Sequence, residues 1–277
     1  MMMLMLAIAT SLSFMTLVVA TYSSSLANQS VWLSATASCG YKNYTTHTFK
    51  GPIANFKLSK VLYNQETSTE GYVGYDSTHK QIWVVFRGTD DYADWLNDGE
   101  SWMNDFSCVS DCNDCKVHHG FNKCFESVRD DMYNAVVALV KQYSDYSLIV
   151  TGHSLGGAMA LLGALYLEQY HTELGKSPTY YSFGSPKVGN DNFASFAETH
   201  ITNSYRVTHF KDTVPHLPLA FYYHHVTTEI YENQNHQLHT CVGESDADCC
   251  QQFPLYELSF DDHVLYLNLS MNCAAVS

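Results

Sequence analysis

The sequence is poor in charged side chains, and poorest in basic ones. Asp, Glu, Lys and Arg make up 15% of its 277 residues, compared with roughly 25% in an average soluble domain. Acidic residues number 28 and basic residues 14, which gives a formal net charge of −14. Affinity for nucleic acid requires Lys and Arg clustered against phosphates, and no basic run occurs in this chain. The composition therefore excludes a nucleic-acid-binding protein.

Internal repeats and low-complexity linkers are also absent from residues 31–277. Aromatic residues are instead abundant, with 20 Tyr, 14 Phe and 4 Trp, and 46% of the chain is hydrophobic. This excludes intrinsic disorder, which is typical of chains with few aromatic residues. Because α/β domains of about 250 residues are common, we expect a single domain.

The N-terminus lacks positive charge, since no Lys or Arg precedes Lys42, but residues 4–20 form an apolar run. Val18 and Ala20, and likewise Ser25 and Ala27, are small residues at the −3 and −1 positions of a possible signal-peptidase site. We expect a signal peptide over residues 1–20, with cleavage as late as residue 27, and a mature domain over 28–277. The alternative is a retained membrane anchor, because about 17 apolar residues is the lower limit for a span.

Nine cysteines fit an oxidising compartment better than the cytosol. Asn28, Asn43 and Asn268 each begin an Asn-x-Ser/Thr triplet, the acceptor for N-glycosylation. Together with the apolar N-terminus, these features predict a secreted, extracellular glycoprotein.

Strand patterns alternate with helical patterns along the chain. Apolar residues at helical spacing indicate helices over 121–143 and 155–170. The predicted strands cover residues 56–63, 72–75, 81–86, 147–150, 180–183, 205–210 and 226–230. This alternation predicts an α/β fold with a central, mostly parallel sheet flanked by helices.

The strongest motif is Gly152-His153-Ser154-Leu155-Gly156, a G-x-S-x-G sequence between a predicted strand and a predicted helix. Glycine at both ends makes room for a sharp, strained turn at the serine. The start of the helix would direct N–H groups at an oxyanion formed beside Ser154. The motif predicts a nucleophilic serine, with a plain Gly-rich turn as the alternative.

A nucleophilic serine needs a histidine base and an orienting carboxylate, which follow it in the order Asp, His in the hydrolase arrangement. Asp212 comes just after the predicted strand 205–210, at the carboxyl end where open α/β sheets place their sites. The histidines after Ser154 are His171, His200, His209, His216, His224, His225, His236, His239 and His263. The residues alone do not choose among them.

Six runs match one family in order, within residues 39–273. They are Phe86-Arg87-Gly88-Thr89, His119-Gly120-Phe121, 150–158, 183–189, 212–218 and Asp262-His263. On these runs the sequence resembles the class 3 lipase family, the filamentous-fungal type of secreted triacylglycerol lipase. The cysteines at 112, 115, 241, 249 and 250 resemble its feruloyl esterase branch.

The resemblance implies a carboxylic ester hydrolase with an α/β-hydrolase-type fold and a lid segment. It implies Ser154 as nucleophile, Asp212 as orienting acid and His263 as general base. It also implies that Thr89 and the Leu155 N–H form the oxyanion hole, and that His216 has a structural role. We expect no cofactor and no metal.

The segment after Thr89 is a candidate lid. Tyr92, Trp95 and Leu96 share one helical face, and Asp91 lies on another. Position within the lipase-like framework favours an amphipathic lid, and a surface helix packed on the core is the alternative.

The expected substrate is a triacylglycerol at a lipid–water interface, cleaved by a monomer with no obligatory protein partner. Feruloyl or other aryl esterase and phospholipase A1 activities are alternatives. A remote alternative is a non-catalytic binding protein on a hydrolase fold.

The resemblance also implies the disulfides Cys39–Cys273, Cys112–Cys115 and Cys241–Cys249. Of the cysteines left over, Cys108 and Cys124 flank the Cys112–Cys115 loop and are expected to form a fourth bridge, with Cys250 free.

Overall fold

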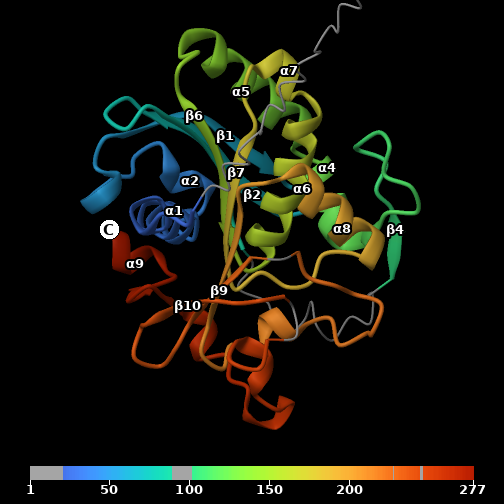
Figure 1. The fold of residues 1–277 in the computed structure, drawn as a ribbon. Helices are drawn as coiled ribbons and strands as arrows, with labels where there is room; N and C mark the ends of the chain where they lie inside the picture. The colour runs from blue at the N-terminus through green and yellow to red at the C-terminus, as the bar shows by residue number, and fades with distance from the viewer. Residues whose placement is uncertain (1–20, 89–101, 227, 244–245) are drawn as a thin grey trace, which may run out of the picture.

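The structure is a computed structural model that describes residues 21–88, 102–226, 228–243 and 246–277. Its centre is an eight-stranded sheet in the order β1-β2-β3-β6-β7-β8-β9-β10 (Figure 1). The strands are β1 (Phe56–Asn64), β2 (Thr69–Asp76), β3 (Gln81–Phe86), β6 (Ser147–His153), β7 (Pro178–Phe183), β8 (Ser204–His209), β9 (Glu229–Glu232) and β10 (Leu238–Thr240).

The first three strands form an antiparallel meander, and the sheet then becomes parallel. β3, β6, β7, β8 and β9 run parallel to one another, and β10 returns antiparallel to β9. The predicted α/β fold with a central, mostly parallel sheet is confirmed. All carboxyl ends of the parallel strands therefore meet at one edge, next to the orange and red segments at the bottom of Figure 1.

Helices cover both faces of the sheet (Figure 1). One face carries α1 (Ser24–Ala37), α2 (Tyr41–Tyr44) and α9 (Cys273–Val276). The other face carries α4 (His119–Glu126), α5 (Arg129–Gln142), α6 (Leu155–Gln169), α7 (His171–Leu174) and α8 (Asp191–His200). The predicted helix over 121–143 is two helices, because the chain leaves helical geometry between α4 and α5, where Val128 has a ψ near 0°.

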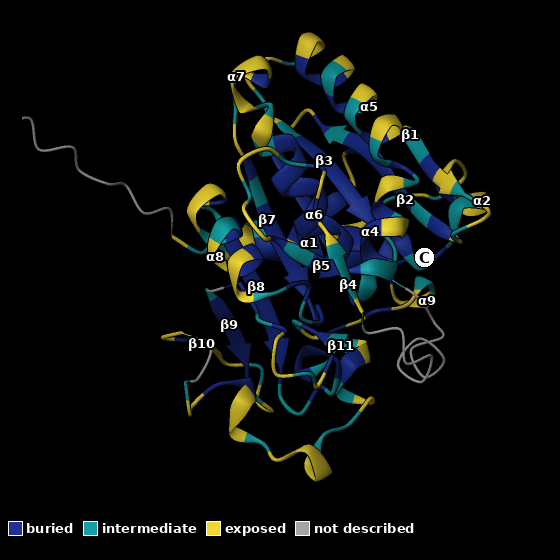
Figure 2. Cartoon of the chain, turned by 90° about the vertical axis from the view of Figure 1, so that its right-hand side faces the viewer, coloured by how far each residue is buried: buried dark blue, intermediate teal, exposed yellow. Residues whose placement is uncertain are grey.

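The alternation of side chains along β3 divides the interior into two cores. Ile82 and Val84 pack with residues of α5 and α6, whereas Trp83 and Val85 pack with residues of α1. Buried residues fill both sides of the sheet, and exposed residues lie on the outer faces of helices such as α5 and α8 (Figure 2).

Short elements surround the edge of the sheet. β4 (Met103–Asp105) pairs with β5 (Lys116–His118), and β11 (Leu265–Tyr266) pairs with β12 (Leu269–Ser270). The 3-10 helices are η1 (Gly51–Ile53), η2 (Val214–His216), η3 (Cys250–Gln252), η4 (Leu255–Glu257) and η5 (Asp262–Val264).

α6 is the most deeply buried helix of the fold's helical layer, since residues 156–167 are all buried. Such a helix must be apolar on every side, because no face of it reaches water. Its sequence of Gly, Ala, Met and Leu meets this requirement, which is why the pattern predicted it well. Within the described residues, no helix combines the length and the apolar character needed to cross a bilayer.

α1 has no counterpart among the predicted elements, because its Ser- and Ala-rich sequence has little amphipathic pattern. Ser23 caps it by accepting a hydrogen bond from the Leu26 amide at 3.3 Å. The Ser23 amide in turn donates to the Tyr181 hydroxyl at 3.2 Å, and Ala27 is completely buried. The helix therefore starts ahead of residue 28, the expected start of the mature domain.

Three disulfides are present: Cys39–Cys273, Cys112–Cys115 and Cys241–Cys249. Cys39–Cys273 ties α1 to α9 across a sequence separation of 234 residues. These pairings are the ones that the family resemblance implies.

The expected Cys108–Cys124 bridge is wrong. The Cys108 thiol lies 3.6 Å from a Glu126 carboxylate oxygen and 3.7 Å from an Arg129 nitrogen. The Cys124 thiol instead donates to the Thr67 carbonyl at 3.8 Å. Cys108, Cys124 and Cys250 are all free thiols. The prediction failed because two cysteines that flank the same loop need not have their sulfur atoms within bonding distance.

Candidate functional site

Ser154 occupies the sharp turn between β6 and α6. Its φ of 58° and ψ of −130° lie outside the ordinary regions for a residue with a side chain. Its amide donates to the Phe183 carbonyl of β7 at 2.9 Å, and its carbonyl accepts from the Gly157 amide at 2.8 Å. The nucleophile predicted from the motif is thus held by backbone hydrogen bonds on both sides.

The two glycines of the motif allow this turn because neighbouring backbone passes very close to them. A Cβ on Gly152 would lie 2.2 Å from the Gly156 carbonyl oxygen, and one on Gly156 would lie 2.3 Å from the Phe86 carbonyl oxygen. Any side chain at either position would displace β3 or the first turn of α6. The structure confirms the role assigned to these glycines.

Asp212 and His263 form a buried pair next to this turn. His263 Nδ1 donates to Asp212 Oδ2 at 2.8 Å, and both side chains are at most 1% exposed. Because an ionised carboxylate only accepts, the proton is on Nδ1, and Nε2 is the basic nitrogen. The other Asp212 oxygen accepts from the Val214 amide at 2.8 Å, which fixes the carboxylate.

The segments that carry the acid and the base are hydrogen-bonded to each other. Asp212 and Ser259 form a parallel β-bridge, and the Ser259 amide donates to the Lys211 carbonyl at 2.8 Å. The short helix η5, which contains His263, follows directly. The geometry of the pair therefore depends on backbone contacts between residues far apart in the sequence.

His153 connects Ser154 to His263. Its Nε2 donates to the His263 carbonyl at 2.8 Å, and the two imidazole rings lie 4.4 Å apart. Since His153 directly precedes Ser154, this hydrogen bond ties the serine turn to the segment that contains His263. Of the histidines after Ser154, His263 is the one that the structure brings to the Asp212 carboxylate.

Sequence reasoning missed Tyr266 and Gly184. The Tyr266 hydroxyl donates to Asp212 Oδ2, the oxygen that also accepts from His263. Burial, followed by the Asp212 charge, raises the pKa of Tyr266 well above its usual range, so the phenol stays a donor. Tyr266 is close to His263 in the sequence, but this does not predict its contact with Asp212. Only the folded chain brings both side chains to the same carboxylate.

Gly184, at the end of β7, packs directly on the acid–base pair. A Cβ there would lie 2.7 Å from the Tyr266 hydroxyl oxygen, 2.8 Å from Asp212 Oδ2 and 2.9 Å from His263 Cε1. Its φ of 58° adds a second reason for glycine.

The oxyanion site is only partly described. Leu155 begins α6, so its backbone N–H lies beside Ser154 at the helix start. Thr89 lies outside the described residues, as do the candidate lid residues Asp91, Tyr92, Trp95 and Leu96. The preceding Gly88 is described: a Cβ on it would lie 3.2 Å from the Ser154 Cβ, so this part of the chain contacts the nucleophile.

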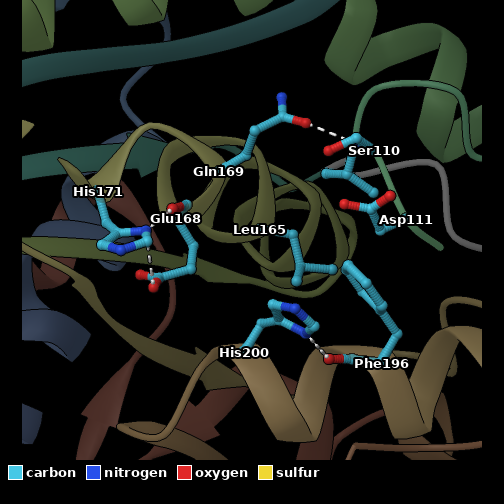
Figure 3. Close-up of a pocket in the computed structure, with 9 residues that line it drawn as sticks. Ser110, Asp111, Leu165, Glu168, Gln169, His171, Phe196 and His200 are labelled. Atoms are coloured by element: carbon cyan, nitrogen blue, oxygen red, sulfur yellow. Dashed lines mark hydrogen bonds and ion pairs between the residues drawn. The ribbon is translucent and has the colours of Figure 1, made fainter. Parts of the chain in front are cut away.

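The remaining downstream histidines lie elsewhere. His171 and His200 line a small cavity of about 140 Å³ at the far end of α6, with Glu168 and Gln169 (Figure 3). α6 has 15 residues, so this cavity is about 20 Å from Ser154 and is not part of the site. His216 and His225 are both buried, and the His225 Nε2 donates to the Pro215 carbonyl.

Four groups of side chains among the described residues have metal-ligand spacing. Three of them include cysteines that are in disulfides, and such sulfurs cannot become thiolate ligands. The fourth consists of His209, Glu232 and His236.

The fold and the serine turn define a protein of the α/β-hydrolase type. The lipase (class 3) family model matches residues 83–222, and the chain belongs to this family. It is 32% identical over 217 residues to a lipase of Rhizopus niveus, covering 77% of this chain and 55% of the relative. It is 31% identical over 221 residues to secreted mono- and diacylglycerol lipase 1 of Fusarium solani, covering 76% of this chain and 64% of the relative.

Solved structures agree with this assignment. The Rhizomucor miehei lipase propeptide complex superposes with a TM-score of 0.81 at 28% identity, covering 92% of this chain and 84% of that chain. A triacylglycerol lipase from Penicillium expansum gives a TM-score of 0.79 at 26% identity, covering 93% and 99%. The chain spans between 55% and 64% of the length of the curated Rhizopus, Rhizomucor and Fusarium relatives.

Two buried histidines, His153 and His118, are expected to make stability depend on pH. Burial, followed by the charge of His263, lowers the pKa of His153 well below its usual value. Burial, followed by the charge of His119, lowers the pKa of His118 to about 4. The unfolded chain takes up these protons near pH 6.5 whereas the folded chain does not, so stability is full above that pH and is lost as the pH falls.

We expect the free energy of unfolding to fall between pH 6 and pH 5 by about 1.4 kcal/mol per pH unit for each such histidine. His118→Asn should reduce this slope by up to about that amount, because Asn keeps an acceptor for the Gly120 amide but does not titrate. Denaturant unfolding at several pH values measures it. An unchanged slope in the variant would show that His118 titrates normally in the folded state.

Proposed function

We propose that this protein is a secreted serine ester hydrolase that cleaves triacylglycerols. The observation that carries the proposal is the strained Ser154 turn, hydrogen-bonded through His153 to a buried Asp212–His263 pair. A serine hydroxyl becomes a nucleophile when a correctly oriented histidine accepts its proton. This arrangement supports acyl transfer through an acyl-enzyme.

In the proposed mechanism His263 Nε2 takes the proton from Ser154 Oγ as the oxygen attacks the ester carbonyl. Asp212 keeps the proton on Nδ1 and stabilises the imidazolium that forms. The Leu155 N–H and Thr89 stabilise the oxyanion, and loss of one such donor costs on the order of 3 kcal/mol. His263 then gives its proton to the departing alcohol, and a water that it activates releases the acid.

Exposed apolar side chains near the acid and the base support a lipid substrate. Leu219 and Phe221, 60% and 90% exposed, follow the Asp212 segment, and Tyr256, 86% exposed, precedes His263. Phe260 and Val264 beside His263 are each 45% exposed. Apolar surface of this kind is typical of sites that contact a lipid or a partner, and the relatives are named as lipases that act on acylglycerols.

We further propose that the segment containing Asp91, Tyr92, Trp95 and Leu96, which lies outside the described residues, acts as an amphipathic lid. We also propose that the chain acts as a monomer at the lipid–water interface. No protein partner is required for the reaction as drawn, since one chain supplies the nucleophile, the acid and the base.

We also propose that the chain is secreted, and the start of α1 bears on where its signal peptide is cleaved. Removal of residues 1–20 would leave Ser23 to cap the helix, whereas cleavage after residue 27 would remove its first turn, including the buried Ala27. We therefore favour cleavage near residue 20. The exposed Asn28, Asn43 and Asn268 side chains are accessible for glycosylation.

Ser154→Ala should reduce ester hydrolysis to background and leave thermal unfolding unchanged. The wild-type chain should hydrolyse emulsified triolein faster than a phospholipid vesicle or methyl ferulate, all assayed side by side. Retained hydrolysis by Ser154→Ala would refute the nucleophile. A preference for methyl ferulate or for phospholipid would instead assign the chain to an aryl esterase or to a phospholipase A1.

Gly184→Ala should lower kcat by at least about 100-fold, because a methyl group there would displace the acid, the base and Tyr266, and small misplacements of catalytic groups have costs of this size. The matched control is Gly175→Ala. That glycine also has a positive φ, of 66°, but a Cβ added to it would have no neighbouring atom within 4 Å. Equal loss of activity in both variants would attribute the effect to backbone strain.

A further inference from the structure

Three side chains with metal-binding atoms meet at the carboxyl ends of β8 and β9, outside the catalytic residues. His209 ends β8, Glu232 ends β9, and His236 lies in the turn that leads to β10. One ligand atom from each lies within 4.8 Å of the other two. The two imidazole rings are nearly parallel, with an interplanar angle of 3° and centroids 5.7 Å apart.

The His209 ring is oriented as in a metal ligand. Its Nδ1 lies 3.0 Å from the Asp262 carbonyl oxygen. A carbonyl only accepts, so Nδ1 carries the proton and the lone pair of the ring is on Nε2. Metal-binding histidines almost always donate their second nitrogen to a carbonyl or carboxylate in this way, because the contact fixes the tautomer and the ring.

The Glu232 carboxylate has one oxygen fixed and one oxygen facing a histidine. Oε2 accepts from the Leu267 amide at 2.9 Å, and Oε1 lies 2.7 Å from His236 Nδ1. The Glu232 side chain is completely buried, and a buried carboxylate is costly without a positive partner. Within the described part of the chain, the group that ion-pairs with it is His236.

Two atoms bound to one zinc ion at about 2.1 Å, in tetrahedral geometry, lie about 3.4 Å apart. The Oε1–Nδ1 separation would therefore have to widen by about 0.7 Å. His236 can make this movement, because its side chain is 29% exposed and it lies in the turn between β9 and β10. The same exposure gives an ion and a water ligand a route from solvent, while His209 and Glu232 stay buried.

We propose that His209, Glu232 and His236 form a binding site for a divalent transition-metal ion of the zinc type, with water as the fourth ligand. Two imidazoles and one carboxylate are a donor set that zinc prefers. The ion would lie between the Glu232 Oε1 and His236 Nδ1 atoms, which now contact each other directly.

Such an ion would join the ends of β8 and β9 to the segment that carries the catalytic base. His209 holds the carbonyl of Asp262, the residue before His263, and Asp212 follows His209 closely in the sequence. The site would thus act as a metal brace, that is, a structural site that stabilises the position of the Asp212–His263 pair, and it takes no part in the reaction. This inference does not depend on the proposed function, because binding and unfolding are measured without substrate.

The test uses the full chain, stripped with EDTA and dialysed into metal-free buffer, and titrated with zinc chloride in a calorimeter. We expect one zinc ion per wild-type chain. His236→Ala should weaken binding by at least about tenfold. Zinc should also raise the Tm of the wild type, since an ion that binds the folded state stabilises it, and should leave the Tm of His236→Ala unchanged.

The matched control is His239→Ala, which removes a neighbouring histidine whose side chain is 52% exposed. This variant should keep the wild-type affinity within about twofold. No zinc binding by the wild type would overturn the proposal. Equal losses in the two variants, or full binding by His236→Ala, would also overturn it, because zinc would then be held by surface histidines. Circular dichroism spectra of both variants in EDTA that match the wild type show that the substitutions preserve the fold. The Tm of His236→Ala in EDTA is expected to be lower, because the buried Glu232 loses its ion-pair partner.

Discussion

The backbone at Ser154, with a φ of 58° and a ψ of −130°, is strained by about 1–3 kcal/mol for a residue with a side chain. The surroundings impose it: β6 lies between two parallel strands, α6 must start at once to cover them, and the chain has room to turn only because Gly152 and Gly156 lack a Cβ. The strained turn places the serine hydroxyl at the start of a helix, beside the loops that contain Asp212 and His263.

Those loops converge because parallel strands place their carboxyl ends at one edge. Asp212 comes after β8, Gly184 after β7 and Ser154 after β6, so three successive strands each contribute to one cluster. Tyr266 and the Val214 amide complete the hydrogen bonds of the Asp212 carboxylate. Both oxygens of this buried carboxylate are thus hydrogen-bonded, which fixes its orientation toward His263. The proposed metal brace lies one hydrogen bond further out, through the Asp262 carbonyl.

The sequence predicts features whose signals lie next to one another along the chain. The strand–Ser154–helix unit was recognisable because its signals are adjacent: an apolar strand, two glycines and an apolar helix. His263 was one of nine histidines until the family resemblance singled it out, since its contact with Asp212 spans 51 positions. The contacts of His153, Gly184 and Tyr266 could not be predicted, because each depends on the register of distant segments. The same limit explains the wrong Cys108–Cys124 pairing and the missed α1, whose burial comes from contacts with the sheet and not from its own pattern.

The proposed mechanism requires that Ser154 is a nucleophile activated by His263. The most direct measurement is mass mapping of the protein after treatment with a p-nitrophenyl alkylphosphonate, which transfers its phosphonyl group to an activated serine and releases p-nitrophenol. We expect one phosphonyl group per chain, on the peptide that contains Ser154, and much slower labelling in His263→Ala. Labelling at another residue, or equally fast labelling of Ser154 without His263, would contradict it.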